Sequence, residues 1–188
     1  MSADAHVSKQ PEVPPAPVLT LTRLTTDFIE DEDRIRIAAE TADGQTVVLW
    51  FTQRLLLRLV PQLIKWLEPN APGRPDAQHL AQQGFAQDAA RAGLRAEPSV
   101  AAQSARLQTR VDAVDVTQSP AVLQMVFRGP DLPQGARLTM EAQPLRQWLG
   151  ILHDRWTRAQ WPQQVWPGWM AGAQAPLSGA AADGVRLH

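Results

Sequence analysis

The run TVVLWFTQRLLLRLVPQLIKWLE, residues 46–68, is the most apolar part of the chain, and its periodicity changes halfway. Up to Phe51, two sets of side chains alternate with the spacing of a strand. Beyond Thr52, a favourable helix N-cap, apolar residues recur at helical spacing and polar residues fill another stripe. We therefore expect a strand that runs directly into an amphipathic helix folded over a sheet, with a kink or restart at Pro61.

Two further strands precede this element. The first is rich in threonine and aliphatic residues, and its apolar phase shifts between Leu21 and Leu24, which predicts a β-bulge. The second leads into Asp43-Gly44, a hairpin signal because this dipeptide tolerates positive φ. Residues 18–68 are thus expected to form a first β-β-β-α unit.

A similar order of patterns recurs over residues 105–161. Three strand patterns separated by turns lead into a closing helix. The number of residues from Trp66 of the first helix to Trp156 of the closing helix equals the number that separates the corresponding leucines of the two helices. Identity between the halves is low, so a duplication and a coincidence of a common topology both remain open. We predict an α+β fold in which two β-β-β-α units form a pseudo-symmetric antiparallel-sheet arrangement, each covered by its helix.

The remaining residues are expected to be tails and a linker. Residues 1–17 are rich in proline and cannot build a core, so we predict a disordered tail. Residues 69–104 form a linker that contains a weakly packed helix. Residues 162–188 join a segment rich in tryptophan and proline to a flexible tail.

Composition limits the classes of function. The chain has 188 residues, 44% of them hydrophobic, which is enough for a core. A formal net charge of −1 argues against a strong general attraction to nucleic acid or membranes. The absence of cysteine excludes disulfides, thiolate catalysis and cysteine-based metal sites. No signal-peptide region and no membrane-spanning apolar run occurs, so we expect a cytoplasmic protein.

No pattern of residues predicts a reaction. Glycine-rich phosphate loops and the GxSxG nucleophile elbow are absent, and His6, His79, His153 and His188 lack a second histidine at metal-ligand spacing. The acidic run at residues 30–33 lacks the spacing of a calcium loop and reads as a solvated turn. His153 reads as a surface or half-buried residue. We predict a non-enzymatic protein without catalytic residues, cofactor or metal site.

The tryptophans give the strongest interaction signal, since the chain has seven of them and no tyrosine. Trp161, Trp166 and Trp169 follow the last helix, and interleaved prolines favour a stiff extended segment. Tryptophan buries a large area and is enriched at binding hot spots. The segment either packs back onto its own helices or docks on another chain, including a second copy. We choose the second reading: a protein–protein interaction module (adaptor, accessory or assembly subunit) with these three residues as partner-binding anchors.

An alternative function rests on basic side chains. Arg34 and Arg36 project from the same face of one predicted strand, and Trp50 and Arg110 lie on neighbouring strands. Arginine and exposed tryptophan on a sheet suit single-stranded nucleic acid, through phosphate contact and base stacking. Acidic residues interrupt this patch and the net charge is not positive, so nucleic-acid binding stays the alternative.

Overall fold

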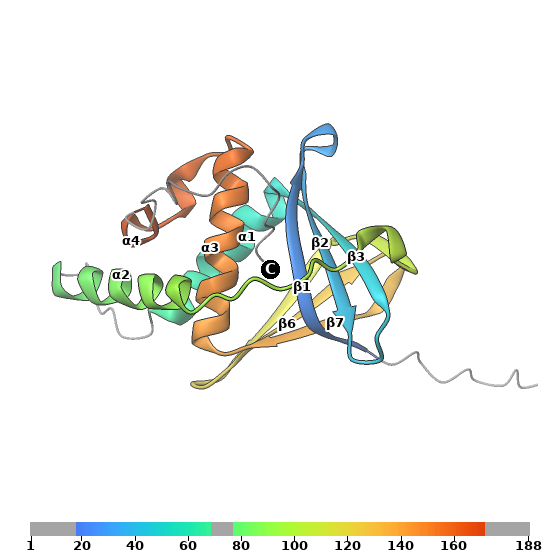
Figure 1. Cartoon of the computed structure of the whole chain (residues 1–188), viewed down its shortest axis with the longest axis horizontal. Coiled ribbons are helices and arrows are strands. Elements are labelled where there is room, and N and C mark those ends of the chain that lie inside the picture. The colour runs from blue at the N-terminus through green and yellow to red at the C-terminus, as the bar shows by residue number, and fades with distance from the viewer. Residues whose placement is uncertain (1–17, 69–76, 172–188) are drawn as a thin grey trace, which may run out of the picture.

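A computed structural model describes residues 18–68 and 77–171 of the chain, and over these residues a seven-stranded mixed sheet and four α-helices form an α+β fold (Figure 1). The strands are β1 (Leu19–Ile29), β2 (Arg34–Thr41), β3 (Thr46–Thr52), β4 (Leu107–Arg110), β5 (Ala113–Gln118), β6 (Leu123–Gly129) and β7 (Leu132–Met140). The helices are α1 (Gln53–Leu67), α2 (Ala77–Ala92), α3 (Ala142–Arg158) and α4 (Gly168–Ala171), with short 3₁₀ turns η1 (Glu30–Glu32), η2 (Ala102–Ser104) and η3 (Gln163–Val165).

The α+β class predicted from the sequence is confirmed. Outside the described residues lie the predicted tail at 1–17, the first part of the predicted linker, 69–76, and the end of the last predicted segment, 172–188. Within the described part, no helix has both the length and the apolar character that crossing a bilayer requires.

The sheet curls until its two ends meet. The strand order is β4-β3-β2-β1-β7-β6-β5, and β4 and β5, at opposite ends of that order, are separated in the chain by only Val111 and Asp112. The N–H of Val111 donates to the carbonyl of Trp50 on β3, whereas the N–H of Asp112 donates to the carbonyl of Arg128 on β6. The chain therefore passes from one end of the sheet to the other within two residues, which closes the sheet into a barrel.

Two pairings in this barrel differ from the antiparallel ones expected from the sequence. Four neighbouring pairs in the described sheet are antiparallel, but β3 runs parallel to β4 and β1 runs parallel to β7. The last strand of each predicted unit thus lies beside the first strand of the other. That reciprocal pairing is what a two-fold arrangement would require, and the duplication itself stays a prediction.

Local features follow the sequence closely. The hydroxyl of Thr52 accepts a 3.3 Å hydrogen bond from the N–H of Leu55 and caps α1, as predicted. The register of β1 against β2 shifts between Leu21 and Arg23, where a bulge is expected. α1 continues through Pro61 without a restart, and the proline lies on its exposed side.

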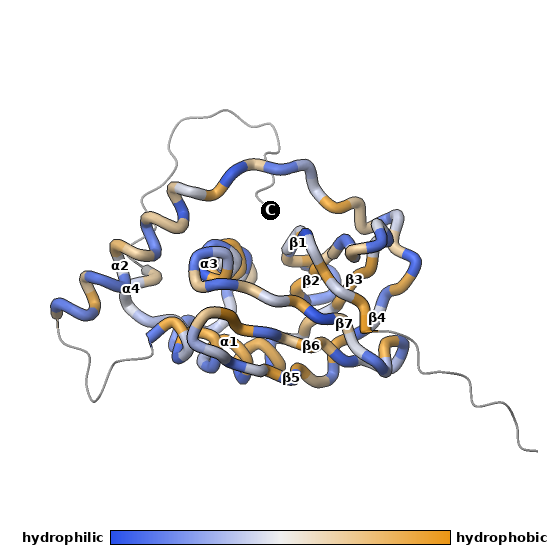
Figure 2. Tube along the Cα trace, turned by 90° about the horizontal axis from the view of Figure 1, so that it is seen from below, coloured by the Kyte–Doolittle hydropathy of each residue, from blue (hydrophilic) through white to orange (hydrophobic). Residues whose placement is uncertain are grey.

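One hydrophobic core fills the barrel and continues beneath α1 and α3. Inside the barrel, Phe51 of β3 and Phe127 of β6 meet edge to face with ring centroids 5.4 Å apart. Figures 1 and 2 place α1 and α3 at the same end of the barrel, where α3 buries Leu149 and Trp156. The apolar stripes read from the sequence therefore point into one shared core.

The segment after α2 is fixed across the outside of the barrel (Figure 2). Val100 packs on Ala38 and Val48, and its N–H donates a 2.8 Å hydrogen bond to the hydroxyl of Thr25. The guanidinium of Arg23 donates to the carbonyl of Pro98. Part of the predicted linker is therefore a covering layer over β1, β2 and β3.

Candidate interaction sites

The three predicted anchor tryptophans lie against the chain's own helices. Trp161 and Trp169 are buried and Trp166 is half-buried. The ring of Trp161 packs edge to face on Trp156 at 5.1 Å, and its indole N–H donates to Asp33. This placement agrees with the first of the two readings of the sequence, in which the segment packs onto the chain's own helices. The partner-binding role of these residues stays a prediction.

The segment that carries these tryptophans contains the short turns η3 and α4, so it is not the fully extended chain that the prolines suggested. Trp169 donates its indole N–H to the carboxylate of Glu68 at the end of α1. The guanidinium of Arg146 on α3 lies 5.2 Å from the centre of the Trp169 ring. The segment therefore ties α1 to α3.

Polar groups join α2 to α3. The side-chain amide of Gln87 donates a 3.0 Å hydrogen bond to the carbonyl of Arg146, and the guanidinium of Arg146 donates to Gln83. Arg91 pairs with Asp154 at 3.1 Å. Burial lowers the pKa of Arg146 from its ordinary value. This interface was not predicted, although the glutamines at positions 83 and 87, one helical turn apart, are a sequence signal for it.

His153 is buried, with 4% of its surface exposed, and this corrects the expectation of a surface or half-buried residue. Its ring meets the edge of Trp166 at 4.9 Å, because the segment after α3 folds back over this side of the helix. Burial lowers the pKa of His153, Asp154 raises it and Arg91 lowers it. The helical pattern marked this position as a polar edge and could not show what covers it.

The structure brings the predicted arginine and tryptophan residues together on one outer face of the barrel. Cross-strand register places Arg36 beside Trp50 and Trp50 beside Arg110, and Arg34 lies two residues from Arg36 on β2. Trp50 is half-buried beside the Val100 cluster. A carboxylate faces each arginine: Glu32 with Arg34 at 3.5 Å, Asp27 with Arg36 at 3.1 Å and Asp112 with Arg110 at 2.8 Å. The face is therefore nearly neutral.

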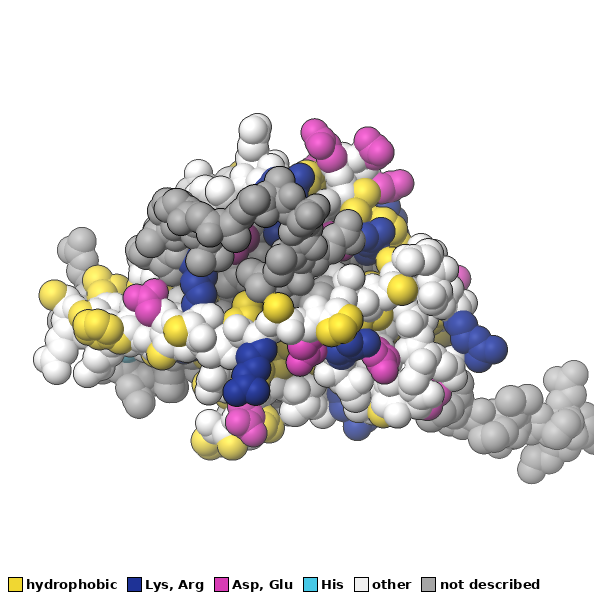
Figure 3. Space-filling model, viewed as in Figure 1, with side chains coloured by type: hydrophobic (Ala, Val, Ile, Leu, Met, Phe, Trp, Pro, Cys, Tyr) yellow, Lys and Arg dark blue, Asp and Glu magenta, His cyan; other side chains and the backbone are white. Residues whose placement is uncertain are grey.

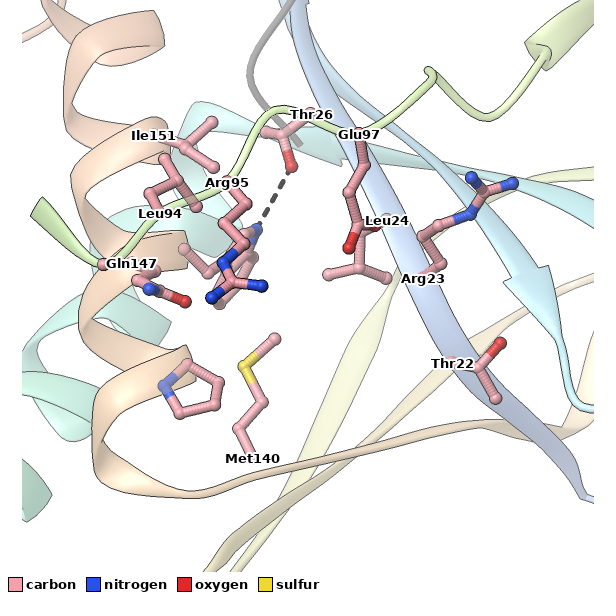
Figure 4. A pocket seen from close by; sticks show the side chains of 13 residues that line it. Thr22, Arg23, Leu24, Thr26, Leu94, Arg95, Glu97, Met140, Gln147 and Ile151 are labelled. Carbon is pink, nitrogen blue, oxygen red and sulfur yellow. Dashed lines mark hydrogen bonds between the residues drawn. The ribbon is translucent and has the colours of Figure 1, made fainter. Parts of the chain in front are cut away.

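A groove of about 390 Å³, here named the β1 groove, opens where β1 separates from β7 (Figure 4). β1 pairs with β7 only at Leu19 and Thr20, and α3 lies beside the rest of the strand. Leu24, Met140 and Trp148 supply apolar walls. The segment from Gly93 to Glu97 forms the remaining side. No sequence pattern predicts the β1 groove, because it exists only where these distant elements meet.

Thr26 shows which way the main chain of β1 points. Its carbonyl accepts a 3.1 Å hydrogen bond from the guanidinium of Arg155. Its hydroxyl accepts one of 3.2 Å from the indole of Trp148, drawn as the dashed line in Figure 4. Main-chain groups of a strand alternate between its two sides, so the N–H and C=O of Leu24 point the same way as those of Thr26. They face the β1 groove, where the described residues offer no strand partner.

Two opposite charges stand at the β1 groove. Arg95 and Glu97 are exposed, and neither forms an ion pair with another described residue. Figure 4 shows both side chains directed toward the groove. An open strand edge, an apolar wall and an unpaired guanidinium can together hold an extended main chain, an apolar side chain and a carboxylate.

No protein-family model, curated protein or solved structure matches this chain. We therefore argue its function from the geometry and chemistry of its own sites.

Proposed function

We propose that the chain is a non-enzymatic protein–protein interaction module that binds an extended segment of a partner in the β1 groove. The observation that carries this proposal is the open edge of β1 between Thr20, where pairing with β7 ends, and Thr26, where α3 covers the strand. Extended peptides add to such edges through main-chain hydrogen bonds and gain specificity from pockets beside the edge. The binding is a static association and requires no reaction centre.

The walls of the β1 groove define the chemistry of the partner segment. Leu24, Met140 and Trp148 favour one apolar side chain, and the unpaired guanidinium of Arg95 favours a neighbouring carboxylate. Glu97 disfavours a second acidic residue on its side of the groove. The volume of about 390 Å³ lies near the lower end for ligand pockets, so we expect a short anchor of a few residues.

Selection from a phage-displayed library of random peptides tests this function on the full chain. We expect an enriched family with an apolar residue beside Asp or Glu, and a fluorescein-labelled member should bind saturably by anisotropy. Arg95→Glu should weaken that binding about tenfold or more, because the new carboxylate would repel the carboxylate of the peptide. Arg58→Glu, a matched charge reversal on the exposed side of α1, should leave it unchanged. Absence of an enriched family, or equal loss in both variants, would remove the proposal.

A second candidate function, binding of single-stranded nucleic acid, is favoured by the row that Arg36, Trp50 and Arg110 form across three strands. Aromatic and basic groups in such a row can stack on bases and contact phosphates. The carboxylate beside each arginine competes with phosphate for the same donors. This competition ranks nucleic acid behind a protein partner.

A further inference from the structure

The side chains of β1 divide the β1 groove into an inner and an outer side. Leu24 packs on the hydrophobic core and Thr26 accepts its hydrogen bond from Trp148, so these alternate residues face inward. Thr25 accepts a 2.8 Å hydrogen bond from the N–H of Val100 and therefore faces outward. A segment that adds to the edge of β1 alternates in the same way. Where one of its residues faces inward, both neighbours face outward.

The outer side of the β1 groove is formed by the segment after α2, here named the strap (residues 94–100). The strap is fixed on the outer face of the barrel, where the carbonyl of Pro98 accepts a 3.2 Å hydrogen bond from Arg23. Arg95 and Glu97 precede this contact, and both side chains are exposed and directed toward the groove (Figure 4). Figure 3 shows basic and acidic side chains close together on the face that the strap crosses. The outer side is therefore charged, whereas the inner side is apolar.

The two charges of the strap are available to a ligand. Over residues 18–68 and 77–171, Arg95 and Glu97 form no ion pair, not even with each other. Arg23 also lines the groove, but its guanidinium already donates to Glu40 at 2.6 Å. Residues two positions apart in a chain lie at most about 7 Å apart, and so do the two outward neighbours of an inward residue. One extended segment can therefore meet both charges at once.

We propose that the β1 groove selects a partner segment in which one apolar residue stands between an acidic and a basic residue. This inference rests on the proposed binding of an extended segment at the edge of β1. The apolar residue points inward to Met140 and Trp148. Its two neighbours point outward to the strap, where the carboxylate meets Arg95 and the cation meets Glu97. Main-chain pairing with β1 fixes the direction of the segment, so one order of the acidic and basic residues fits both charges.

The opposite charges of the strap also define what the groove rejects. A uniformly acidic segment meets the carboxylate of Glu97, and a uniformly basic one meets the guanidinium of Arg95. Like charges brought together at an interface lower affinity for the wrong partner. A free apolar amino acid carries both charges but lacks the flanking main chain that pairs with the edge of β1. The partner is therefore a polypeptide segment of mixed charge.

Two fluorescein-labelled peptides of identical composition test this inference on the full chain. Each has a leucine in a glycine-serine host, flanked by aspartate and lysine in one order or in the reverse order. By anisotropy, the unsubstituted protein should bind one peptide about tenfold more tightly than the other. Arg95→Glu combined with Glu97→Arg should reverse this preference. The exchange leaves the net charge of protein and peptides unchanged, so long-range attraction cannot cause the reversal.

A neutral double variant, Arg95→Gln with Glu97→Gln, is the matched control. It should bind both peptides equally, because the apolar wall and the edge of β1 are unaltered, and excess free leucine should displace neither peptide. Equal binding of both peptides by the unsubstituted protein would overturn selection by the strap, and so would an unreversed preference in the exchanged variant. Either result would leave binding of an extended segment intact. Failure of both peptides to bind would remove the proposed function and this inference together.

Discussion

The indole N–H of Trp161 donates a 2.8 Å hydrogen bond to the carboxylate of Asp33, a residue 128 positions earlier in the chain. Asp33 ends η1 in the left-handed region, with φ 46°, at the turn between β1 and β2. The Trp161 ring also meets Phe28 edge to face at 5.8 Å. The residue that follows the last long helix therefore stabilises the first hairpin, and this gives a test of whether the tryptophans serve the fold.

Trp161→Ala should lower the free energy of unfolding by about 3–5 kcal/mol, because it removes a buried aromatic side chain and leaves a cavity. Asp33→Ala should lower it by only about 1 kcal/mol, since the carboxylate is at the surface. Urea unfolding followed by tryptophan fluorescence and circular dichroism measures both changes. Gln164→Ala, an exposed neighbour in η3, serves as the control and should change stability by less than about 0.5 kcal/mol.

The same measurement separates the two sequence readings of Trp161, Trp166 and Trp169. Replacement of all three by alanine should cause global unfolding if they complete the core. A triple variant that keeps its circular dichroism spectrum and stability, yet loses a partner, would instead support the predicted anchor role.

Glycine substitutions should report on the closure of the barrel. A Cβ on Gly129 would lie 2.3 Å from the carbonyl oxygen of Arg110 and 2.6 Å from the hydroxyl of Thr109, so Gly129→Ala must push β4 away from the end of β6. We expect a loss of about 2–3 kcal/mol of unfolding free energy. If Gly129→Ala lowers the unfolding free energy no more than substitution of a turn glycine does, β4 and β6 are not tightly packed where the barrel closes.

Two other glycines provide matched controls for Gly129→Ala. Gly44 has φ +78° and open space around it, so Gly44→Ala should lose only about 1–2 kcal/mol from backbone strain. Gly84 lies in α2 with nothing near its Cβ position, so Gly84→Ala should gain about 0.5–1 kcal/mol by favouring the helix. The melting temperature should therefore be highest for Gly84→Ala, intermediate for Gly44→Ala and lowest for Gly129→Ala.

Acidification should destabilise the protein through His153. Burial lowers the pKa of this histidine in the folded state, so the unfolded chain takes up its proton first as the pH falls. The stability contributed by neutral His153 is present above the unfolded pKa of about 6.5 and is lost as the pH falls through the lower folded pKa. Asp154 and Arg91 act on the same ring in opposite directions.

Urea midpoints between about pH 5 and pH 8 measure this effect. His153→Gln should flatten the decline below pH 6.5, and Gln164→Ala, the exposed control used above, should leave its slope in place. An unchanged slope in His153→Gln would assign the acid sensitivity to the carboxylates.

Single-stranded nucleic acid should not bind with measurable affinity. A labelled oligothymidylate titrated at about 50 mM and about 200 mM salt tests this, since phosphate contacts weaken steeply over that range. The carboxylates beside Arg34, Arg36 and Arg110 are the reason for the expected negative result. Saturable binding at low salt that is lost in Trp50→Ala would establish the second candidate function in its place.

The elements that sequence reasoning located correctly share a local cause. The N-cap at Thr52, the bulge after Leu21 and the turn at Gly44 each depend on residues within a few positions of one another. The apolar stripes of α1 and α3 follow from the helical period alone. The grouping of Arg36, Trp50 and Arg110 was also foreseen, because strand alternation places them on one face.

Neither the burial of His153 nor the presence of the β1 groove could be predicted from local sequence patterns. The first depends on Trp166 folding back across α3, and the second on β1 leaving β7 after two paired residues. Hydrophobic periodicity tells which side of an element is apolar, but it carries no information on which other element covers the polar side.

Periodicity, turn chemistry and composition were therefore enough to establish the α+β class and the capped strand-to-helix junction at residues 46–68. The parallel pairings of β3 with β4 and of β1 with β7, the barrel they close and the groove they leave open required the folded chain. These features depend on edges and faces that lie, in some cases, about a hundred residues apart in the chain. The free energy that selects among such arrangements comes from packing between elements rather than within them.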